Sequence, residues 1–164
     1  MIAGAQVERV TAVELRRATP EDRGDLVAMY LSFEPKGAAM GLPPHKEPQK
    51  WLDRLAAHPN FIVRIDGRLV GHAVLCVRGY TGEIALFIHQ DYRGRGLAKK
   101  LLRETIEEAR RLGLRRVWAV AEFDNFPMFR LALSLGFVPS KNPHKFYLDL
   151  RTPAPAEHEL VSAN

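Results

Sequence analysis

Two apolar segments flank a strongly amphipathic one in the second half of the chain. The segment Glu83–His89 has a near-continuous apolar centre, which is typical of a strand buried on both faces. From Leu97 to Leu112 apolar residues recur every three to four positions, the period of an amphipathic helix, and Gly113 supplies the stop. The segment Arg116–Ala121 is apolar again. Because two strands joined through a helix lie parallel, we expect one parallel strand–helix–strand unit.

The rest of the chain favours antiparallel strands with helices between them. Asp66-Gly67, a strong hairpin signal, separates two β-rich runs, and Thr19-Pro20 supplies a helix N-cap followed by a first-turn proline. Asn125 and Gly136 bracket another helix. The predicted strands are Val13–Arg17, Asn60–Ile65, Leu69–Val77 and Phe146–Leu150, and a short helix carries Trp51, Leu52 and Leu55. The fold class is therefore predicted to be α+β, around a mixed and mostly antiparallel sheet with flanking helices.

Length and composition indicate one domain. With 164 residues, of which 46% are hydrophobic, the chain can bury a single sizeable core. We expect the domain to cover residues 13–150, with an N-terminal extension at 1–12 and a flexible C-terminal tail at 151–164. The longest apolar runs have about five residues, far below the ~20 that cross a bilayer, and the first residues do not read as a secretory signal. A single cysteine, Cys76, excludes an internal disulfide, so a cytoplasmic location is expected.

The net charge and the spacing of the histidines indicate which kinds of ligand the chain could bind. Lys and Arg number 24 against 19 Asp and Glu, a net charge of +5, which favours an anionic ligand without saying which. Nucleic-acid binding has only this net charge in its favour. The six histidines show neither an H-x-H nor an H-E-x-x-H spacing, so no metal site is predicted.

A glycine-rich turn, Gln90–Ala98, links the first buried strand to the amphipathic helix. Such a turn offers unpaired backbone N–H groups and the positive end of the helix dipole, which suit a phosphate or pyrophosphate. A dinucleotide fingerprint would need a third glycine where Lys99 stands, and no segment matches the nucleoside-triphosphate P-loop. Both of those nucleotide motifs are therefore excluded.

Two motifs carry a family resemblance. Arg93-Gly-Arg-Gly-Leu-Ala98 reads as R-x-x-G-x-A and resembles the acyl-CoA pyrophosphate loop of the GNAT N-acetyltransferase superfamily. The segment Asn125–Phe137 is similar to that family's N-x-x-(small or Met) segment ending in Gly-Phe. The resemblance covers about residues 13–150 and implies a GNAT-like fold and an acetyl-CoA-dependent N-acetyltransferase.

The resemblance also implies the residues that hold acetyl-CoA. Backbone groups of the central strand would pair with the pantetheine arm, with the Ile88 N–H near the thioester oxygen, where it would act as an oxyanion donor. Amides of the glycine-rich turn would hold the pyrophosphate, and Asn125 would either contact the arm or serve only as an N-cap. The expected acetyl-CoA contacts are Phe87, Ile88, Arg93, Gly94, Arg95, Gly96, Leu97, Ala98 and Asn125.

The catalytic candidates are two glutamates. Many family members have a tyrosine general acid seven residues after the Asn, and Ala132 occupies that position here. An amine with a pKa of ~10.4 is neutral in roughly one molecule in 2,000 at pH 7, so a base is useful. Glu83 begins the central strand, where lysine-acetylating relatives place a base, and Glu122 ends the adjacent strand as the second candidate. Whether any general acid exists stays open.

The resemblance implies that the acceptor is a primary amine. The stretch Met128–Ala132 resembles the GNAT domains of bacterial protein-lysine acetyltransferases, which favours a protein lysine over a small amine. The Pro- and Gly-rich segment Glu34–Pro48 lies where this family shapes the acceptor side of the cleft. Direct attack of the amine is expected, because Cys76 has no evident partner base. A small-amine acetyltransferase and a non-catalytic acyl-CoA-binding module are the alternatives, and a homodimer is left open.

Overall fold

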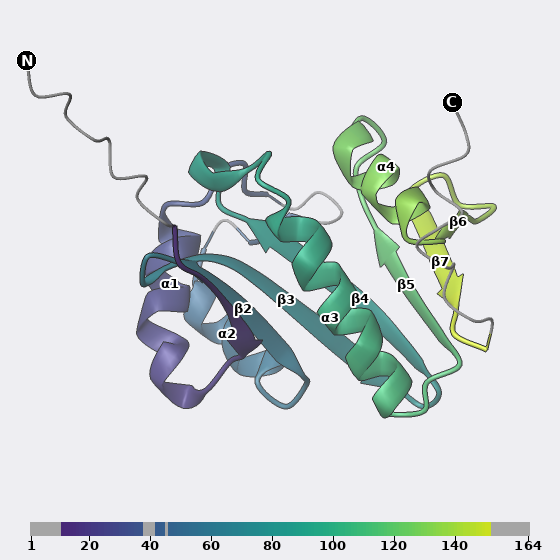
Figure 1. The fold of residues 1–164 in the computed structure, drawn as a ribbon, viewed down its shortest axis with the longest axis horizontal. Helices are drawn as coiled ribbons and strands as arrows, with labels where there is room; N and C mark the ends of the chain where they lie inside the picture. The colour runs from purple at the N-terminus through teal and green to yellow at the C-terminus, as the bar shows by residue number, and fades with distance from the viewer. Residues whose placement is uncertain (1–10, 38–41, 45, 152–164) are drawn as a thin grey trace, which may run out of the picture.

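The structure is a computed structural model that describes residues 11–37, 42–44 and 46–151. A seven-stranded sheet with the order β1-β2-β3-β4-β5-β7-β6 forms its centre. Helices α3 and α4 cover one face, whereas α1 and α2 cover the other face over β2, β3 and β4 (Figure 1). The strands are β1 (Val13–Arg17), β2 (Asn60–Ile65), β3 (Arg68–Arg78), β4 (Thr81–Ile88), β5 (Arg116–Val120), β6 (Val138–Pro139) and β7 (Lys145–Asp149). The helices are η1 (Pro20–Asp22), α1 (Arg23–Leu31), α2 (Pro48–Leu55), η2 (Gln90–Tyr92), α3 (Leu97–Arg111) and α4 (Phe126–Ser134).

The predicted α+β class and the single crossover unit are confirmed. Among the described strands, β4 and β5 form a parallel pair and the other neighbouring pairs are antiparallel. The Asp66-Gly67 turn has positive φ at both residues, 47° and 82°, as a two-residue hairpin turn requires. No helix of the described residues has the length and apolar character needed to cross a bilayer.

Three details differ from the sequence-based expectations. The short edge strand β6 was not predicted, since two residues are too few for a periodic pattern. Pro48, assigned to a loop, begins α2, where its missing N–H costs no hydrogen bond. Trp118, expected in the core, is only half-buried because the sheet face it occupies is not covered by a helix.

The sheet divides between β4 and β5. Register between these strands runs only from Thr81 to Glu83 on β4, opposite Arg116 to Trp118 on β5. Beyond Glu83, β4 continues to pair with β3 as far as Ile88, whereas its other edge has no strand partner among the described residues. The two halves of the sheet therefore separate and leave a cleft whose β4 wall offers backbone hydrogen-bonding groups.

A buried carboxylate joins β1, β2 and α1. Asp22 is only 2% exposed and accepts hydrogen bonds from Arg16 Nη1 at 2.6 Å and Arg64 Nη2 at 2.8 Å. The hydrogen bonds and the two positive charges hold the pKa of Asp22 well below its usual range. Its stabilising contribution is fully present above the unfolded pKa of about 4 and is lost as the pH falls towards the folded pKa.

We expect Asp22→Asn to lower the free energy of unfolding by about 3 kcal/mol at pH 7, because it leaves two arginines without their buried partner. The difference from the wild type should shrink as the pH is lowered below about 4, where the unfolded state binds the proton. Urea unfolding at several pH values measures this difference in the free energy of unfolding. Asp25→Asn is the matched control, since Asp25 also pairs with Arg64 at 2.8 Å but is exposed, and it should cost less than about 1 kcal/mol. Equal losses in the two variants would contradict the assignment.

Candidate active site

Two cavities open into the cleft between β4 and β5, one from each face of the sheet. The first, of about 330 Å³, lies beside the glycine-rich turn and α4, and the second, of about 200 Å³, lies on the opposite face beside Glu83. Leu86, Asn125 and Met128 line both cavities. A ligand in one cavity would therefore approach a ligand in the other across the splay of the sheet.

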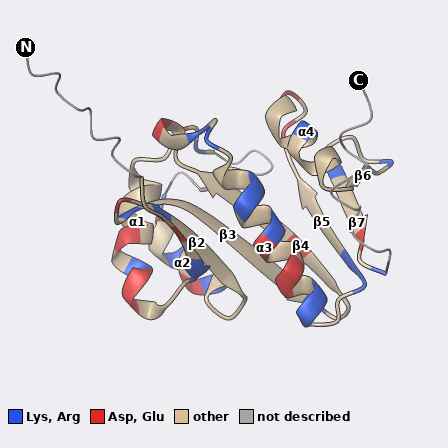
Figure 2. Ribbon diagram, in the orientation of Figure 1, with Lys and Arg blue, Asp and Glu red and all other residues tan. Residues whose placement is uncertain are grey.

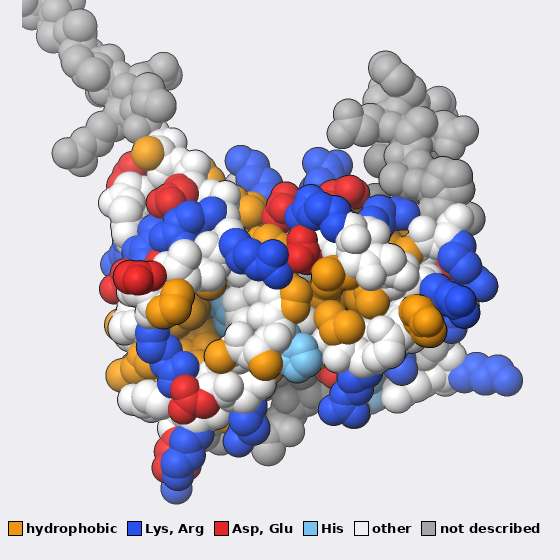
Figure 3. Space-filling view, turned by 90° about the horizontal axis from the view of Figure 1, so that it is seen from below, with side chains coloured by type: hydrophobic (Ala, Val, Ile, Leu, Met, Phe, Trp, Pro, Cys, Tyr) orange, Lys and Arg blue, Asp and Glu red, His pale blue; other side chains and the backbone are white. Residues whose placement is uncertain are grey.

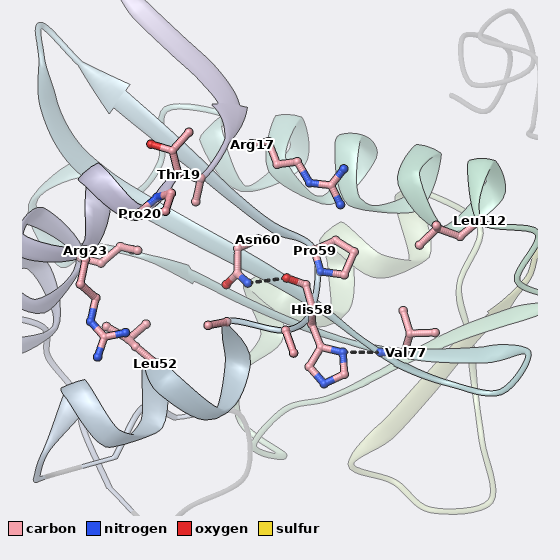
Figure 4. A pocket seen from close by; sticks show the side chains of 14 residues that line it. Arg17, Thr19, Pro20, Arg23, Leu52, His58, Pro59, Asn60, Val77 and Leu112 are labelled. Atoms are coloured by element: carbon pink, nitrogen blue, oxygen red, sulfur yellow. Dashed lines mark hydrogen bonds between the residues drawn. The ribbon is translucent and has the colours of Figure 1, made fainter.

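A larger cavity, of about 760 Å³, lies elsewhere, between the start of α1, the end of α2 and the end of α3 (Figure 4). Its two arginines already have partners, because Arg17 pairs with Glu108 at 2.9 Å and Arg23 with Asp53 at 2.7 Å. At this end of the molecule, hydrophobic side chains gather near the centre with Lys and Arg side chains around them (Figure 3). The cavity contains neither the glycine-rich turn nor either of the two glutamates predicted as bases, so we take the splay as the candidate active site.

The turn before α3 is built to receive an anion. Gly94 and Gly96 have φ angles of 75° and 76°, in the left-handed region that favours glycine, and a Cβ at either would meet only open space. Neither a side-chain cap nor an acidic residue occupies the first turn of α3. Its first N–H groups and the positive dipole end therefore face the cavity without a competing carboxylate. Basic residues gather on the same turn and on the start of the helix (Figure 2), and Lys99 lines the cavity.

The side chain of Arg93 is held by two hydrogen bonds to backbone carbonyl groups, although the residue is exposed and borders the first cavity. Its Nε donates to the Ile88 carbonyl oxygen at 3.0 Å and its Nη2 donates to the Glu34 carbonyl oxygen at 2.8 Å. The guanidinium also lies over the Phe33 ring, 5.3 Å from its centroid, and burial lowers its pKa. Arg93 thus fixes the end of β4 to the residues that follow α1 through its side chain, while its backbone stays available to a ligand.

A second tether joins the same two segments. Gln90 Nε2 donates to the Ser32 carbonyl oxygen at 2.7 Å, and Gln90 Oε1 accepts the Glu34 N–H at 2.9 Å. The Ser32 hydroxyl also lies 3.0 Å from His89 Nε2. These bonds attach the turn that precedes α3 to the beginning of the segment between α1 and α2, which reaches the second cavity at Leu42.

For the acetyltransferase expected from the sequence, Gln90→Ala should raise the KM for the amine about fivefold or more and leave the KM for acetyl-CoA within twofold. Its two hydrogen bonds, of about 1 kcal/mol each, hold the segment that is expected on the acceptor side. Steady-state kinetics with each substrate varied in turn measures this split. Asp91→Asn, an exposed change in the same turn, is the control and should alter neither value. A Gln90→Ala enzyme with an unchanged amine KM would remove the positioning role.

Glu83 lines the second cavity from the base of the splay. Its side chain is half-buried, so burial raises its pKa, while the positive charges of Arg78 and Lys145 act in the opposite direction. Its cross-strand neighbours are Cys76 on β3 and Trp118 on β5. A carboxylate in this position can accept a proton from an amine that enters the cavity.

Glu122 stands apart from that cavity. It follows the end of β5, and its carbonyl oxygen accepts the Asn125 N–H at 2.9 Å. Neither of the two cavities at the splay is lined by Glu122. The structure therefore brings Glu83, Phe87 and Asn125 together but leaves Glu122 beyond the lining.

Asn125 caps α4 and also borders the cleft. Its side-chain oxygen accepts the Met128 N–H at 3.3 Å, which confirms the predicted cap. The side-chain amide nitrogen forms no hydrogen bond with a described residue, so that group is available for a ligand. Ala132, at the position of the family's tyrosine, is 1% exposed within the core.

Two side chains beside Glu83 were not predicted from the sequence. Lys145 Nζ lies 4.0 Å from the centroid of the Trp118 ring, on the open face of the sheet. Their proximity depends on the register of β5 with β7, which pairs Trp118 with Tyr147. Sequence patterns give no signal for this pairing, because the two strands are joined through α4 and β6.

Comparison with known proteins defines the class of the chain. Residues 25–137 match the model of the acetyltransferase (GNAT) family, and the protein belongs to this family. It is 39% identical over 87 residues to Acetyltransferase PA5475 of Pseudomonas aeruginosa, a match covering 50% of this chain and 46% of the relative. It is 29% identical over 103 residues to the L-amino acid N-acetyltransferase AaaT of Escherichia coli, covering 57% of this chain and 64% of the relative. The chain thus spans less than two thirds of the length of these curated relatives.

A solved structure extends the comparison over most of the fold. The yncA protein of Salmonella typhimurium, whose structure was determined with its cofactor acetyl-CoA, matches with a TM-score of 0.70 and 26% identity. The match covers 89% of this chain and 99% of that protein. The predicted GNAT-like fold is therefore confirmed.

Proposed function

We propose that the protein transfers the acetyl group of acetyl-CoA directly to a primary amine. The observation that carries this proposal is the cleft that opens on both faces of the sheet. An anion-binding turn lies on one face and a half-buried glutamate on the other. Such an arrangement lets a thioester and an amine meet within one ternary complex.

The cleft fits acetyl-CoA on physical grounds. The uncapped N–H groups at the start of α3 suit its pyrophosphate, and the β4 edge beyond Glu83 offers Phe87 and Ile88 to the pantetheine arm. Acetyl-CoA supplies an acyl group activated as a thioester. The amides of residues 93–98 bind the pyrophosphate, and the side chain of Asn125 contacts the pantetheine arm. The Ile88 N–H donates a hydrogen bond to the thioester oxygen as it becomes an oxyanion.

Glu83 acts as the general base. A lysine-like amine has a pKa of about 10.4 and is almost fully protonated at neutral pH, so attack requires a proton acceptor. The raised pKa of Glu83 makes it a better acceptor than an exposed glutamate. Glu122 is the second candidate. The leaving thiol has a pKa of about 8.5 and departs without the tyrosine that Ala132 replaces.

Cys76 takes no part as a nucleophile. Burial and the neighbouring Glu83 raise the pKa of its thiol, which keeps it protonated and weakly reactive. A covalent acetyl-enzyme is therefore not needed, and no metal takes part in the proposed reaction.

The domain boundaries and cellular setting complete the proposal. Residues 13–150 form the acetyltransferase domain, with 1–12 and 151–164 as extensions that lie largely outside the described residues. The protein works in the cytoplasm as a monomer or homodimer. Two acceptor classes have support. The resemblance at Met128–Ala132 favours a protein lysine, and the similarity to the L-amino acid N-acetyltransferase AaaT favours a free amino acid.

The test is a mass-balanced turnover assay. Purified protein is incubated with acetyl-CoA and a panel of amino acids, small amines and lysine peptides. Thiol release is followed together with the mass of the acetylated product. Stoichiometric thiol and acetyl-amine are expected with at least one acceptor. Binding of acetyl-CoA without turnover of any acceptor would instead support the non-catalytic acyl-CoA-binding module.

A further inference from the structure

The sheet face opposite α3 carries a line of functional groups across three strands. Glu83 on β4 lies in register with Trp118 on β5, which lies in register with Tyr147 on β7. Lys145 stands two residues from Tyr147 and so occupies the same face. Because its Nζ lies 4.0 Å from the Trp118 ring centroid, the Lys145 side chain extends from β7 across β5 in the direction of β4.

A second cation approaches Glu83 from the other side. Arg78 on β3 stands two residues beyond Cys76, the cross-strand partner of Glu83, so Arg78 and Glu83 are diagonal neighbours on one face. Neither Arg78 nor Lys145 forms an ion pair with a carboxylate of the described residues. Arg116, on the same face, differs because it pairs with Asp149 at 3.9 Å. Glu83 is thus flanked by two cations that form no ion pair with another carboxylate in the part of the chain that the structure describes.

This arrangement is unfavourable for a simple monoamine. An ammonium ion that enters beside Glu83 is attracted by the carboxylate and repelled by the two cations, so it binds less favourably than beside an isolated carboxylate. A substrate that carries its own carboxylate removes the repulsion and gives a cation a partner through a charge-assisted hydrogen bond. The same cations lower the pKa of the bound ammonium and so favour the neutral amine that attacks.

We propose that the acceptor is a free amino acid, whose amine faces the Glu83 carboxylate and whose carboxylate is held by the Lys145 ammonium. This inference rests on the proposed acetyltransferase function. Ala85, Phe87 and Val120 line the cavity beside Glu83, and Lys145 lies just outside this lining, as the cross-strand partner of Val120. The preferred amino acid therefore has an apolar side chain. In the reaction an N–C bond forms at the acetyl carbon and the C–S bond breaks. The sulfur keeps the electron pair, and the amine proton passes through Glu83 to solvent.

The test compares acids with their amides. Steady-state kinetics are measured for L-leucine, L-methionine and L-phenylalanine and for the carboxamide of each, which keeps the amine and removes the negative charge. We expect the wild type to favour at least one acid over its amide by about tenfold or more in kcat/KM. In Lys145→Met, whose side chain can still cover Trp118, that preference should disappear while the KM for acetyl-CoA is unchanged.

Two variants serve as controls. Lys141→Met removes an exposed lysine from the same β6–β7 connection and should keep the wild-type acid-to-amide ratio. Lys145→Arg keeps the charge and should restore most of the preference that Lys145→Met loses. A purely structural role for Lys145 would change acids and amides equally.

The experiment distinguishes a failure of the amino-acid assignment from a failure of the proposed acetyltransferase function. Turnover of lysine peptides or amides at rates equal to the acids would overturn the amino-acid assignment and leave the acetyltransferase function standing. An acid preference that survives in Lys145→Met would also overturn it. Absence of thiol release with every amine would overturn both.

Discussion

Gly96→Glu is expected to abolish acetyl-CoA binding, the largest effect of any single change at the cofactor side. The glutamate would put bulk and a negative charge at the uncapped start of α3, where the pyrophosphate is proposed to sit. In the wild type, acetyl-CoA at a hundred times its Kd should stabilise the fold by about 2.7 kcal/mol. Thermal unfolding with and without acetyl-CoA should show this gain in the wild type and none in the variant.

The matched control lies at the other end of the same helix. Gly113 has a φ angle of 72°, close to the 76° of Gly96, and a Cβ at either position meets only open space. Both substitutions therefore carry a similar backbone strain of roughly 1–2 kcal/mol. Gly113→Glu should lose stability but keep the full acetyl-CoA response. Equal responses in the two variants would mean that the turn before α3 is structural only.

The elements that position the cofactor side were predictable because their signals are local. The positive φ angles at Gly94 and Gly96, the cap from Asn125 and the apolar stripe of α3 each depend on residues close in sequence. A strand–helix–strand connection has one favoured geometry, so the parallel pair followed from its three parts. The motif then placed the anion-binding turn at the cleft.

The acceptor side was less predictable because it is assembled from distant strands. Lys145 meets Trp118 only through the register of β5 with β7, and Arg78 approaches Glu83 only through that of β3 with β4. The Arg93 side chain is positioned by a hydrogen bond to the carbonyl oxygen of Glu34, which is 59 residues away. The apolar sequence of its strand favours a buried Trp118, yet none of the described helices covers its face of the sheet. Such contacts leave no trace in local periodicity.

Glu83→Gln is expected to lower kcat by about a hundredfold or more at neutral pH while acetyl-CoA affinity is retained, because glutamine keeps the shape but cannot accept the amine proton. The substitution also removes the negative charge that lies between Lys145 and Arg78. The defect should be measured with saturating amine and acetyl-CoA, and equilibrium binding of acetyl-CoA to the variant gives the control for folding.

The pH dependence separates a base from a merely structural carboxylate. In the wild type, activity should fall at low pH as Glu83 is protonated, and burial places this loss at higher pH than for an exposed glutamate. In Glu83→Gln, activity should recover in part as the pH rises, because free amine accumulates without a base. Glu122→Gln is the matched variant and should keep the wild-type profile, since Glu122 lines neither cavity at the splay. A fully active Glu83→Gln beside an inactive Glu122→Gln would transfer the base to Glu122, and the amine would then approach from the end of β5 rather than from the base of the splay.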